Sequence, residues 1–391
     1  MPLAPLDQSI TVPDLVRDPY AIYAELRAHA PVTRVAAVGR TFLTKAADTR
    51  YVKDTPSLFS SNDPNTPMKR AFLAHTLMRK DGDAHLRERM AMAPAFAPKV
   101  IQQTWMPIYE QTAEAYVSAL PRGETVDLFT ALAAPYAARG LAHLLGLAEA
   151  TDDDMIRWSQ ALIDGAGNFG WADAPFAVSD QANTEIDALL ARKSALLKSN
   201  PDDSALSVMV NASDPIPESQ IASNIKIAIG GGLNEPRDAL LTALAGVLGD
   251  PEQRVEATRS QNWTAVFEEA IRWVAPIQAS SRLVLEDTQI RGCDIPAGDT
   301  VMTIQASACH DEELYDAPER FDMTRPKQPH QAFGNGPHFC QGTHVARRML
   351  AHIMLPMLFD RFPKMELAEP NGVPWTGFGF RGPAHLHVTL N

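Results

Sequence analysis

The chain has 391 residues, of which 45% are hydrophobic, and a formal net charge of −12. This length allows a sizeable core, and the acidic balance argues against nucleic-acid binding, which needs a basic face. No apolar run reaches the roughly 18 residues of a membrane span, and the N-terminal segment lacks the pattern of a signal peptide. Because no linker, low-complexity tract or repeat divides the sequence, we expect one domain over residues 1–391, located in the cytoplasm.

Helical and strand patterns alternate unevenly along the chain. Apolar periodicity and capping residues predict helices at residues 20–28, 46–51, 83–89, 101–120, 134–147, 152–163, 181–199, 218–248, 268–273 and 341–361. Short β-like runs fall at residues 32–38, 41–44, 283–285, 288–290 and 300–304. This distribution predicts a mainly α fold with small β-sheets.

Residues 57–80 form a long polar stretch that contains several apolar side chains, among them Phe72 and Met78. Such a segment is either an under-packed connector or a wall of a ligand pocket. Long loops in compact domains are more often functional than not, so we favour the pocket wall. A second irregular segment, residues 165–175, is rich in glycine and aromatic residues and is typical of the tip of a lid between two helices.

The longest predicted helix, residues 218–248, is interrupted at its centre. Residues 230–232 are all glycine, and Pro236 follows Glu235 directly. Inside a helix each glycine costs about 1 kcal/mol and a proline about 3 kcal/mol, and the proline predicts a kink. This composition indicates that a flat group approaches the backbone here. Glu235 is then either a pocket acid or an ordinary solvated carboxylate.

Residues 333–342 read Phe-Gly-Asn-Gly-Pro-His-Phe-Cys-Gln-Gly. Three glycines and a proline in ten residues predict a rigid irregular loop. The loop carries Cys340 just before a helix, where free amides and the helix dipole favour a thiolate, the form that binds metal. The alternative is a buried free cysteine beside a turn. The other two cysteines, Cys293 and Cys309, share no Cys-x-x-Cys spacing with it, which argues against a disulfide framework, a zinc site or an iron–sulfur cluster.

The loop matches every fixed position of Phe-Gly-x-Gly-x-His-x-Cys-x-Gly, and in this it resembles the cysteine loop of the cytochrome P450 superfamily. The resemblance extends over essentially the whole chain and implies the haem-thiolate fold of that family. It also implies haem b as cofactor, with Cys340 as the axial ligand of the iron and Phe333 beside it. A haem sensor without turnover, or a protein without haem, remains a rival hypothesis.

The same resemblance implies further cofactor contacts. His85 and Arg89, four residues apart on one helix, match the pair that contacts a haem propionate, and Arg282 and His338 match further propionate ligands. Glu269 and Arg272, three apart on a helix, resemble the structural pair that a third arginine completes; the sequence suggests Arg320 for that role.

The central helix departs from the family pattern Ala/Gly-Gly-x-Asp/Glu-Thr, because Pro236 occupies the threonine position. In the family this threonine helps to deliver protons for dioxygen activation. We therefore expect the proton route to use Asn234 and Glu235 through water, or a hydroxyl group of the substrate. Direct use of peroxide, as a peroxygenase, remains open.

The resemblance implies a monooxygenase that uses O2 and electrons from a separate partner, a ferredoxin or a flavin/iron–sulfur reductase, because no reductase segment is fused to the chain. Thiolate donation to the iron favours O–O cleavage. A small basic patch of Lys99, Arg347 and Arg348 is either the docking surface or a merely solvated face.

The substrate class follows from a narrower resemblance. Asn234-Glu-Pro and the C-terminal Gly377-Phe-Gly-Phe-Arg-Gly-Pro are similar to motifs of bacterial aromatic O-demethylases. This implies O-demethylation of a small methoxyphenol such as guaiacol, syringol or a 4-alkylguaiacol, with release of formaldehyde. The implied pocket residues are Phe72, Met78, Ala166, Phe169, Ile227, Gly231 and Phe380. Hydroxylation of another small hydrophobic molecule is the alternative.

Overall fold

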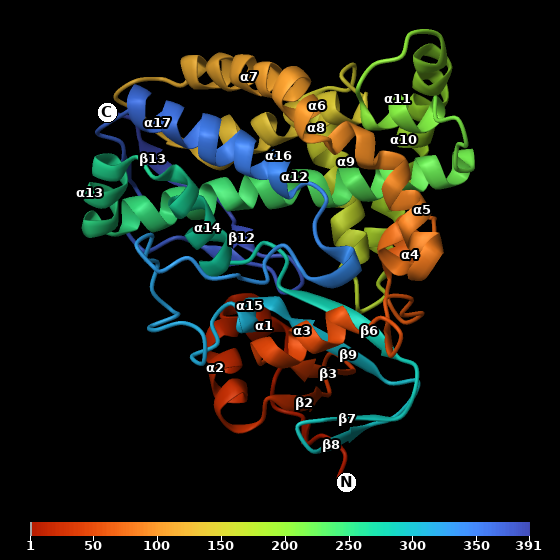
Figure 1. Cartoon of the computed structure of the whole chain (residues 1–391). Coiled ribbons are helices and arrows are strands. Elements are labelled where there is room, and N and C mark those ends of the chain that lie inside the picture. Colours follow the sequence, from red (N-terminus) through yellow and green to blue (C-terminus); the bar gives the residue numbers. More distant parts are fainter. Residues whose placement is uncertain (1) are drawn as a thin grey trace. The chain divides into compact units, whose positions relative to one another are not determined.

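The computed structural model describes residues 2–391, and helices predominate over small sheets, as predicted (Figure 1). The chain forms two compact units, each assembled from separate segments. The first comprises Met1–Asn65, Leu241–Cys340 and Asn371–Ala384, and the second comprises Thr66–Leu240, Gln341–Pro370 and His385–Asn391. The expectation of one functional domain stays a prediction.

The first unit contains the main sheet, which has six strands in the order β1-β2-β3-β9-β6-β4. Their bounds are β1 Leu6–Asp7, β2 Val32–Val35, β3 Arg40–Leu43, β4 Phe59–Ser60, β6 Ala279–Val284 and β9 Thr300–Ile304. β2 pairs antiparallel with β3, and β6 pairs antiparallel with β9. Two smaller ribbons pair β7 Thr288–Ile290 with β8 Cys293–Ile295, and β11 Trp375–Thr376 with β12 Gly382–Pro383.

The first unit also contains helices. They are α1 Val12–Arg17, α2 Pro19–His29, α3 Ala46–Asp54, α13 Pro251–Ser260, α14 Trp263–Trp273 and α15 Gln305–Ala308. Of these, α3 packs against β9 and α15 against β6. The predicted start of α2 is confirmed, because the Asp18 side chain accepts a hydrogen bond from the Tyr20 amide at 3.2 Å. The sheet packs an apolar cluster that includes Leu43, Phe59 and Val301, all fully buried.

The second unit is almost entirely helical. Its helices are α4 Met68–Ala71, α5 Gly82–Met92, α6 Pro98–Val100, α7 Met106–Ala119, α8 Ala134–Leu145, α9 Asp152–Ala166, α10 Asp173–Ser199, α11 Ala205–Val210, α16 Thr343–Arg347 and α17 Leu355–Arg361. A three-stranded sheet, β10 Glu366–Leu367, β13 His387–Thr389 and β5 Thr125–Asp127, closes it. The helix α12, Glu218–Gly249, begins in this unit and continues without a break through Pro236.

Several predicted helices have different bounds in the structure, and two of them show why. α10 begins at Asp173 rather than at residue 181, because Pro175 is tolerated in the first helical turn. The helix predicted over residues 341–361 is instead α16, a π-helical turn Arg348–Met354, and α17.

Prolines explain why three helices begin with a wider, π-helical turn. Three π-helical turns, Ile101–Trp105, Phe129–Ala133 and Arg348–Met354, each end two residues before a proline in the next helix. A proline has no N–H to donate to the carbonyl four residues earlier. The preceding turn therefore widens, and the chain remains helical on both sides.

Candidate active site

The first unit contains the cysteine loop. Gly334 and Gly336 have positive φ angles of 74° and 62°, which glycine adopts without strain. The Phe339 amide donates to the Gly336 carbonyl at 3.0 Å, and the Cys340 amide donates to the Phe333 carbonyl at 2.9 Å. These bonds close the loop on itself and leave the Cys340 residue half-buried in a fixed position.

Gly336 also fixes the loop against the end of α3. A Cβ atom at Gly336 would lie 2.4 Å from the Lys53 carbonyl oxygen and 3.2 Å from an oxygen of the Asp54 carboxylate. No side chain fits there, since the nearer atom belongs to the backbone. The glycine that the sequence placed four residues before Cys340 is therefore required both for its φ angle and for this close approach.

Three basic or hydrogen-bonding side chains accompany the loop in the same unit. His338 Nε2 lies 2.9 Å from Ser61 Oγ, and Arg282 is buried in β6. The Lys53 side chain is also buried, and its Nζ has no hydrogen-bond partner among the described residues. Burial, followed by the nearby charge of Arg282, lowers the pKa of Lys53 to about 7. Two neighbouring buried cations favour an anion in this place.

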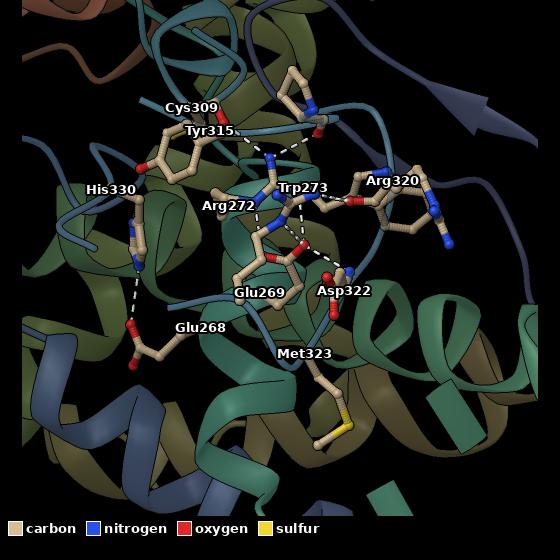
Figure 2. Close-up of polar contacts among 12 residues, drawn as sticks. Glu268, Glu269, Arg272, Trp273, Cys309, Tyr315, Arg320, Asp322, Met323 and His330 are labelled. Atoms are coloured by element: carbon tan, nitrogen blue, oxygen red, sulfur yellow. Dashed lines mark hydrogen bonds and ion pairs between the residues drawn. The ribbon is translucent and has the colours of Figure 1, made fainter. Parts of the chain in front are cut away.

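A buried ion pair supports the same unit from α14 (Figure 2). Arg272 Nε donates to Glu269 Oε2 at 2.7 Å, and both side chains are almost fully buried. All five N–H donors of Arg272 are used. They bond both Glu269 oxygens and the carbonyls of Cys309, Pro318 and Arg320.

The third member of this cluster is Arg325, and the prediction of Arg320 was wrong. Arg325 Nε donates to Glu269 Oε1 at 3.1 Å, whereas the exposed Arg320 contributes its carbonyl oxygen only. The predicted motif was close in sequence, but four residues of irregular chain lie between the two arginines. The local sequence pattern could not show which of the two arginine side chains points towards Glu269.

Phe380 lies at the C-terminal hairpin of the first unit. The hairpin is attached beside the start of β6, because the Gln278 amide donates to the Gly379 carbonyl at 3.0 Å and the Arg381 amide donates to the Pro276 carbonyl at 2.9 Å. Phe378 is buried and stacks on Phe42, while Phe380 is only half-buried. Of the two aromatic rings, Phe380 is the one able to meet a ligand.

In the second unit, one face of α12 is left partly accessible. Between residues 227 and 236, the positions that are not buried are Ile227, Ala228, Gly231, Gly232, Glu235 and Pro236. They recur every four residues, so they form one stripe along the helix. Because Pro236 has no N–H, the Gly232 carbonyl on this stripe lacks its helical donor. Gly231, Gly232 and the freed carbonyl leave the backbone accessible along part of this stripe, and the approach of a flat group there stays a prediction.

The three glycines of this stretch differ in their surroundings. A Cβ at Gly230 would lie 3.0 Å from the Phe72 ring, and a Cβ at Gly232 would lie 2.9 Å from a methyl group of Leu141. At Gly231 the nearest atom would be Glu235 Oε1, at 3.9 Å. Gly230 and Gly232 therefore permit packing, whereas Gly231 keeps the accessible stripe open.

Glu235 lies on the accessible stripe, but its carboxyl group is shielded from water. Both carboxylate oxygens are buried, and neither accepts a hydrogen bond within residues 2–391. Burial raises the pKa of Glu235 to about 8. The acid is therefore mostly protonated at neutral pH, which is unusual for a glutamate and typical of functional sites.

The neighbouring polar residues of α12 are held to one another. Arg237 donates from Nε to Asp238 Oδ1 at 2.7 Å and from Nη1 to Asn234 Oδ1 at 2.9 Å, and all three side chains are buried. The Arg237 guanidinium lies 4.5 Å from the centre of the Phe129 ring. Asn234 is thus oriented by Arg237, while Glu235 is left available.

The remaining predicted residues of the second unit occupy different environments. Phe72 and Ala166 are buried, Phe169 is half-buried, and Met78 is exposed. Phe72 and Gly230 are brought into contact, as described above. On α5, His85 is buried and Arg89 is half-buried, and the Arg89 carbonyl accepts a hydrogen bond from Gln341 Nε2 at 3.3 Å.

These residues fit a haem. The first unit supplies a half-buried cysteine in a rigid loop, together with a buried ammonium group that needs an anion such as a propionate. The second unit supplies an open glycine stripe with a protonatable acid. Sequence reasoning missed Lys53 because α3 is a polar helix whose composition resembles that of an exposed one, and its burial depends on contacts far away in sequence.

A sequence model of the family described as cytochrome P450 matches residues 262–372, which include Arg282 and the whole cysteine loop. The chain is 28% identical over 393 residues to the cytochrome P450 monooxygenase PikC of Streptomyces venezuelae, which covers 95% of this chain and 90% of that protein. It is 25% identical over 395 residues to the biotin biosynthesis cytochrome P450 of Bacillus subtilis, with 96% and 97% covered.

Solved structures agree in fold. P450BioI in complex with hexadec-9Z-enoic acid ligated acyl carrier protein matches with a TM-score of 0.88 and 23% identity, over 97% of this chain and 100% of that one. CalO2 matches with a TM-score of 0.87 and 24% identity, over 100% and 99%. None of the helices in the described residues has the length and apolar character needed to cross a membrane. The chain therefore has the cytochrome P450 fold, and its sequence is similar to cytochrome P450 monooxygenases over nearly its whole length.

Proposed function

We propose that the enzyme demethylates a small methoxyphenol, and that Cys340 is the thiolate ligand of its haem iron. The observation that carries the proposal is the accessible stripe of α12, where Gly231 is open and the Glu235 carboxyl group has no partner within residues 2–391. Gly231 and Gly232 place no side chain on this part of the stripe, which suits a flat aromatic ring. A buried acid without a partner suits a ligand that brings a hydroxyl group.

Several residues are the candidates for holding the haem. Cys340 would bind the iron, and Arg282, His338 and Lys53 would pair with the propionates, with His85 and Arg89 as further propionate contacts. Phe333 would shield the thiolate. When bound, the haem supplies the oxidising chemistry that inserts one atom of O2 into a C–H bond.

The protein's own residues would position the methoxy group and supply protons. Glu235, protonated at neutral pH because of its raised pKa, can donate a proton that the missing threonine would otherwise help to deliver. Asn234, held by Arg237, would position water or substrate beside it. A phenol hydroxyl could hydrogen-bond the free carboxyl oxygen of Glu235.

The residues that we assign to the substrate are those implied by the resemblance to aromatic O-demethylases. They are Phe72, Met78, Ala166, Phe169, Ile227, Gly231 and Phe380. Phe72 is fixed by its contact with Gly230, and Ala166 is a small, buried residue. By the resemblance Ala166 replaces a bulkier aromatic residue, and we infer that the smaller side chain allows a second methoxy group or a short para-alkyl chain on the substrate.

The overall reaction consumes one O2, two electrons and two protons for each methyl group removed. One oxygen atom enters a methyl C–H bond, the resulting hemiacetal breaks into the phenol and formaldehyde, and the other oxygen atom leaves as water. We propose that the electrons arrive from a separate ferredoxin or flavin/iron–sulfur reductase. Arg347, Arg348 and Lys99 are the candidate docking residues, and both Arg348 and Lys99 are exposed.

A peroxygenase is the second candidate function. It is favoured by Pro236, which places no hydroxyl group beside Glu235. In that reaction hydrogen peroxide would replace O2, the electrons and the protons.

One experiment separates these functions. The purified haem-loaded protein is incubated with guaiacol, syringol or 4-propylguaiacol, either with NADH and a ferredoxin–reductase pair or with hydrogen peroxide alone. The demethylase proposal expects one formaldehyde for each NADH consumed and little product with peroxide. Product with peroxide alone would establish the peroxygenase. Hydroxylated product without formaldehyde would overturn the demethylase assignment.

A further inference from the structure

A cluster of metal-ligating side chains lies at the C-terminal sheet of the second unit, which does not contain Cys340. The cluster consists of Glu369, which follows β10, and of His385 and His387 at the start of β13. The Ala368 amide donates to the His387 carbonyl at 2.8 Å, and the Leu386 amide donates to Asp127 Oδ1 at 3.0 Å. These backbone bonds fix the strand that carries both histidines.

The two histidines are directed at one oxygen. His385 Nδ1 and His387 Nδ1 each lie 3.0 Å from Glu369 Oε1, and their ring centres are 4.6 Å apart. The three ligand atoms all lie within 4.8 Å of one another. The Glu369 side chain is only 8% exposed, whereas the histidine side chains are 41% and 42% exposed. The carboxylate is thus fixed, and the rings remain within reach of an ion from solvent.

Hydrogen bonds alone satisfy these three side chains poorly, because too many donors meet one carboxylate oxygen. Glu369 Oε1 also accepts a hydrogen bond from the His387 backbone amide, at 2.7 Å. If both ring nitrogens donate as well, three donors share one oxygen, which has two lone pairs. A cation placed between the ring nitrogens and the carboxylate would accept electron pairs from all three groups and remove the crowding.

The distances also suit a metal ion. Zn²⁺ binds imidazole nitrogen and carboxylate oxygen at about 2.1 Å. At the tetrahedral angle that zinc prefers, two such ligands are separated by about 3.4 Å, so each 3.0 Å separation between an Nδ1 and Oε1 would have to lengthen by only ~0.4 Å to admit the ion. Two imidazoles and one carboxylate form a donor set that zinc and its neighbours in the first transition series accept.

We propose that Glu369, His385 and His387 form a binding site for a divalent transition-metal ion, with Zn²⁺ as the probe and water completing the coordination. The site is independent of the haem and of the reaction. Its metal links the segment after β10 to β13 and so stabilises the C-terminal sheet.

The test is isothermal titration of the metal-stripped, haem-loaded protein with Zn²⁺, together with thermal unfolding in the presence and absence of the metal. The proposal expects one Zn²⁺ per chain and a higher unfolding temperature with zinc. His385→Asn and Glu369→Gln should each bind Zn²⁺ about 10- to 100-fold more weakly and lose the stabilisation.

His29→Asn is the matched control, because His29 is an exposed histidine on α2 beside Glu25 and outside the cluster. Its zinc affinity should equal that of the wild type. His385 is half-exposed, so its substitution keeps the fold even if Glu369→Gln disturbs the sheet. Absence of saturable binding, or equal binding by wild type and His385→Asn, would overturn the proposal.

Discussion

The ring of Phe72 lies 3.0 Å from the point where a Cβ atom on Gly230 would be. Phe72 is fully buried, so its ring has no space into which to retreat. This contact joins the apolar loop of residues 57–80 to the glycine stretch of α12. It makes Phe72 a fixed wall beside the accessible stripe.

Gly230→Ala should therefore destabilise the protein by about 1–3 kcal/mol, because the added methyl group overpacks the core. Gly231→Ala is the matched variant, since its methyl group would meet nothing closer than 3.9 Å. It should keep or raise the stability through helix propensity, yet weaken methoxyphenol binding because it narrows the open stripe. Denaturant unfolding and optical ligand titration measure the two effects. Equal loss of stability in both variants would contradict the assignment.

The Lys53→Met variant tests whether the buried side chain of Lys53 pairs with an anion such as a haem propionate. In the haem-free protein, the pKa of Lys53 is lowered to about 7 from an ordinary 10.5, so the unfolded chain binds its proton more tightly. The stability of the wild type should then rise as the pH increases from about 7 towards 10.5, and the variant should lack this rise.

The haem-loaded Lys53→Met protein should release haem faster than the wild type to an apoprotein scavenger, because a propionate loses its buried partner. Lys364→Met removes an exposed lysine and should release haem at the wild-type rate. If Lys53→Met retains haem as long as this control does, Lys53 has no part in the cofactor site.

Glu235→Gln tests the buried acid. The pKa of Glu235 is raised to about 8 from 4.5, so the folded protein holds this proton more tightly than the unfolded chain. Stability should fall as the pH rises from about 4.5 to about 8, and the variant should lack this component of the fall. Demethylation should drop by about 10²- to 10⁴-fold if the proton is transferred in the reaction.

The wild-type rate should also decline above a pH of about 8, where Glu235 loses its proton. Formaldehyde release measured across pH checks this. Asp164→Asn is the control, because burial raises the pKa of this acid as well but it lies outside the stripe. A wild-type rate in Glu235→Gln would refute the proton-donor role.

Arg325→Ala and Arg320→Ala separate two arginines that the sequence could not distinguish. Arg325 Nε bonds Glu269, and its other nitrogens bond carbonyls of the adjacent loop. Its loss should cost about 1.5–3 kcal/mol, as for a hydrogen bond to a charged group. Arg320→Ala should change the stability by less than about 0.5 kcal/mol. Urea unfolding of both variants measures this, and a reversed order would contradict the ion pair between Arg325 and Glu269.

The sequence was sufficient for the features whose chemistry is local. The glycines around Cys340 and along α12 have backbone requirements that are visible in the chain itself, and the structure explains Gly336 and Gly230 by close contacts. The π-helical turns also had a local signal, a proline two residues beyond each turn, but periodicity alone does not reveal a change of hydrogen-bond register.

Features that depend on distant contacts were not predictable. Lys53 is buried by segments far from α3 in sequence, and Arg325 rather than Arg320 meets Glu269 because of the path of an irregular loop. Glu369 meets His387 only because β10 and β13 pair. In each case the residue type was visible, but its partner was not.

The most direct test of the account is an optical titration of the ferric, haem-loaded protein with guaiacol, syringol and 4-propylguaiacol. The account predicts a saturable Soret shift, tightest for one of these phenols and weakened in Gly231→Ala. If the protein is plainly haem-loaded and none of the three phenols shifts its spectrum, the methoxyphenol site on α12 is contradicted, and only the cytochrome P450 fold remains.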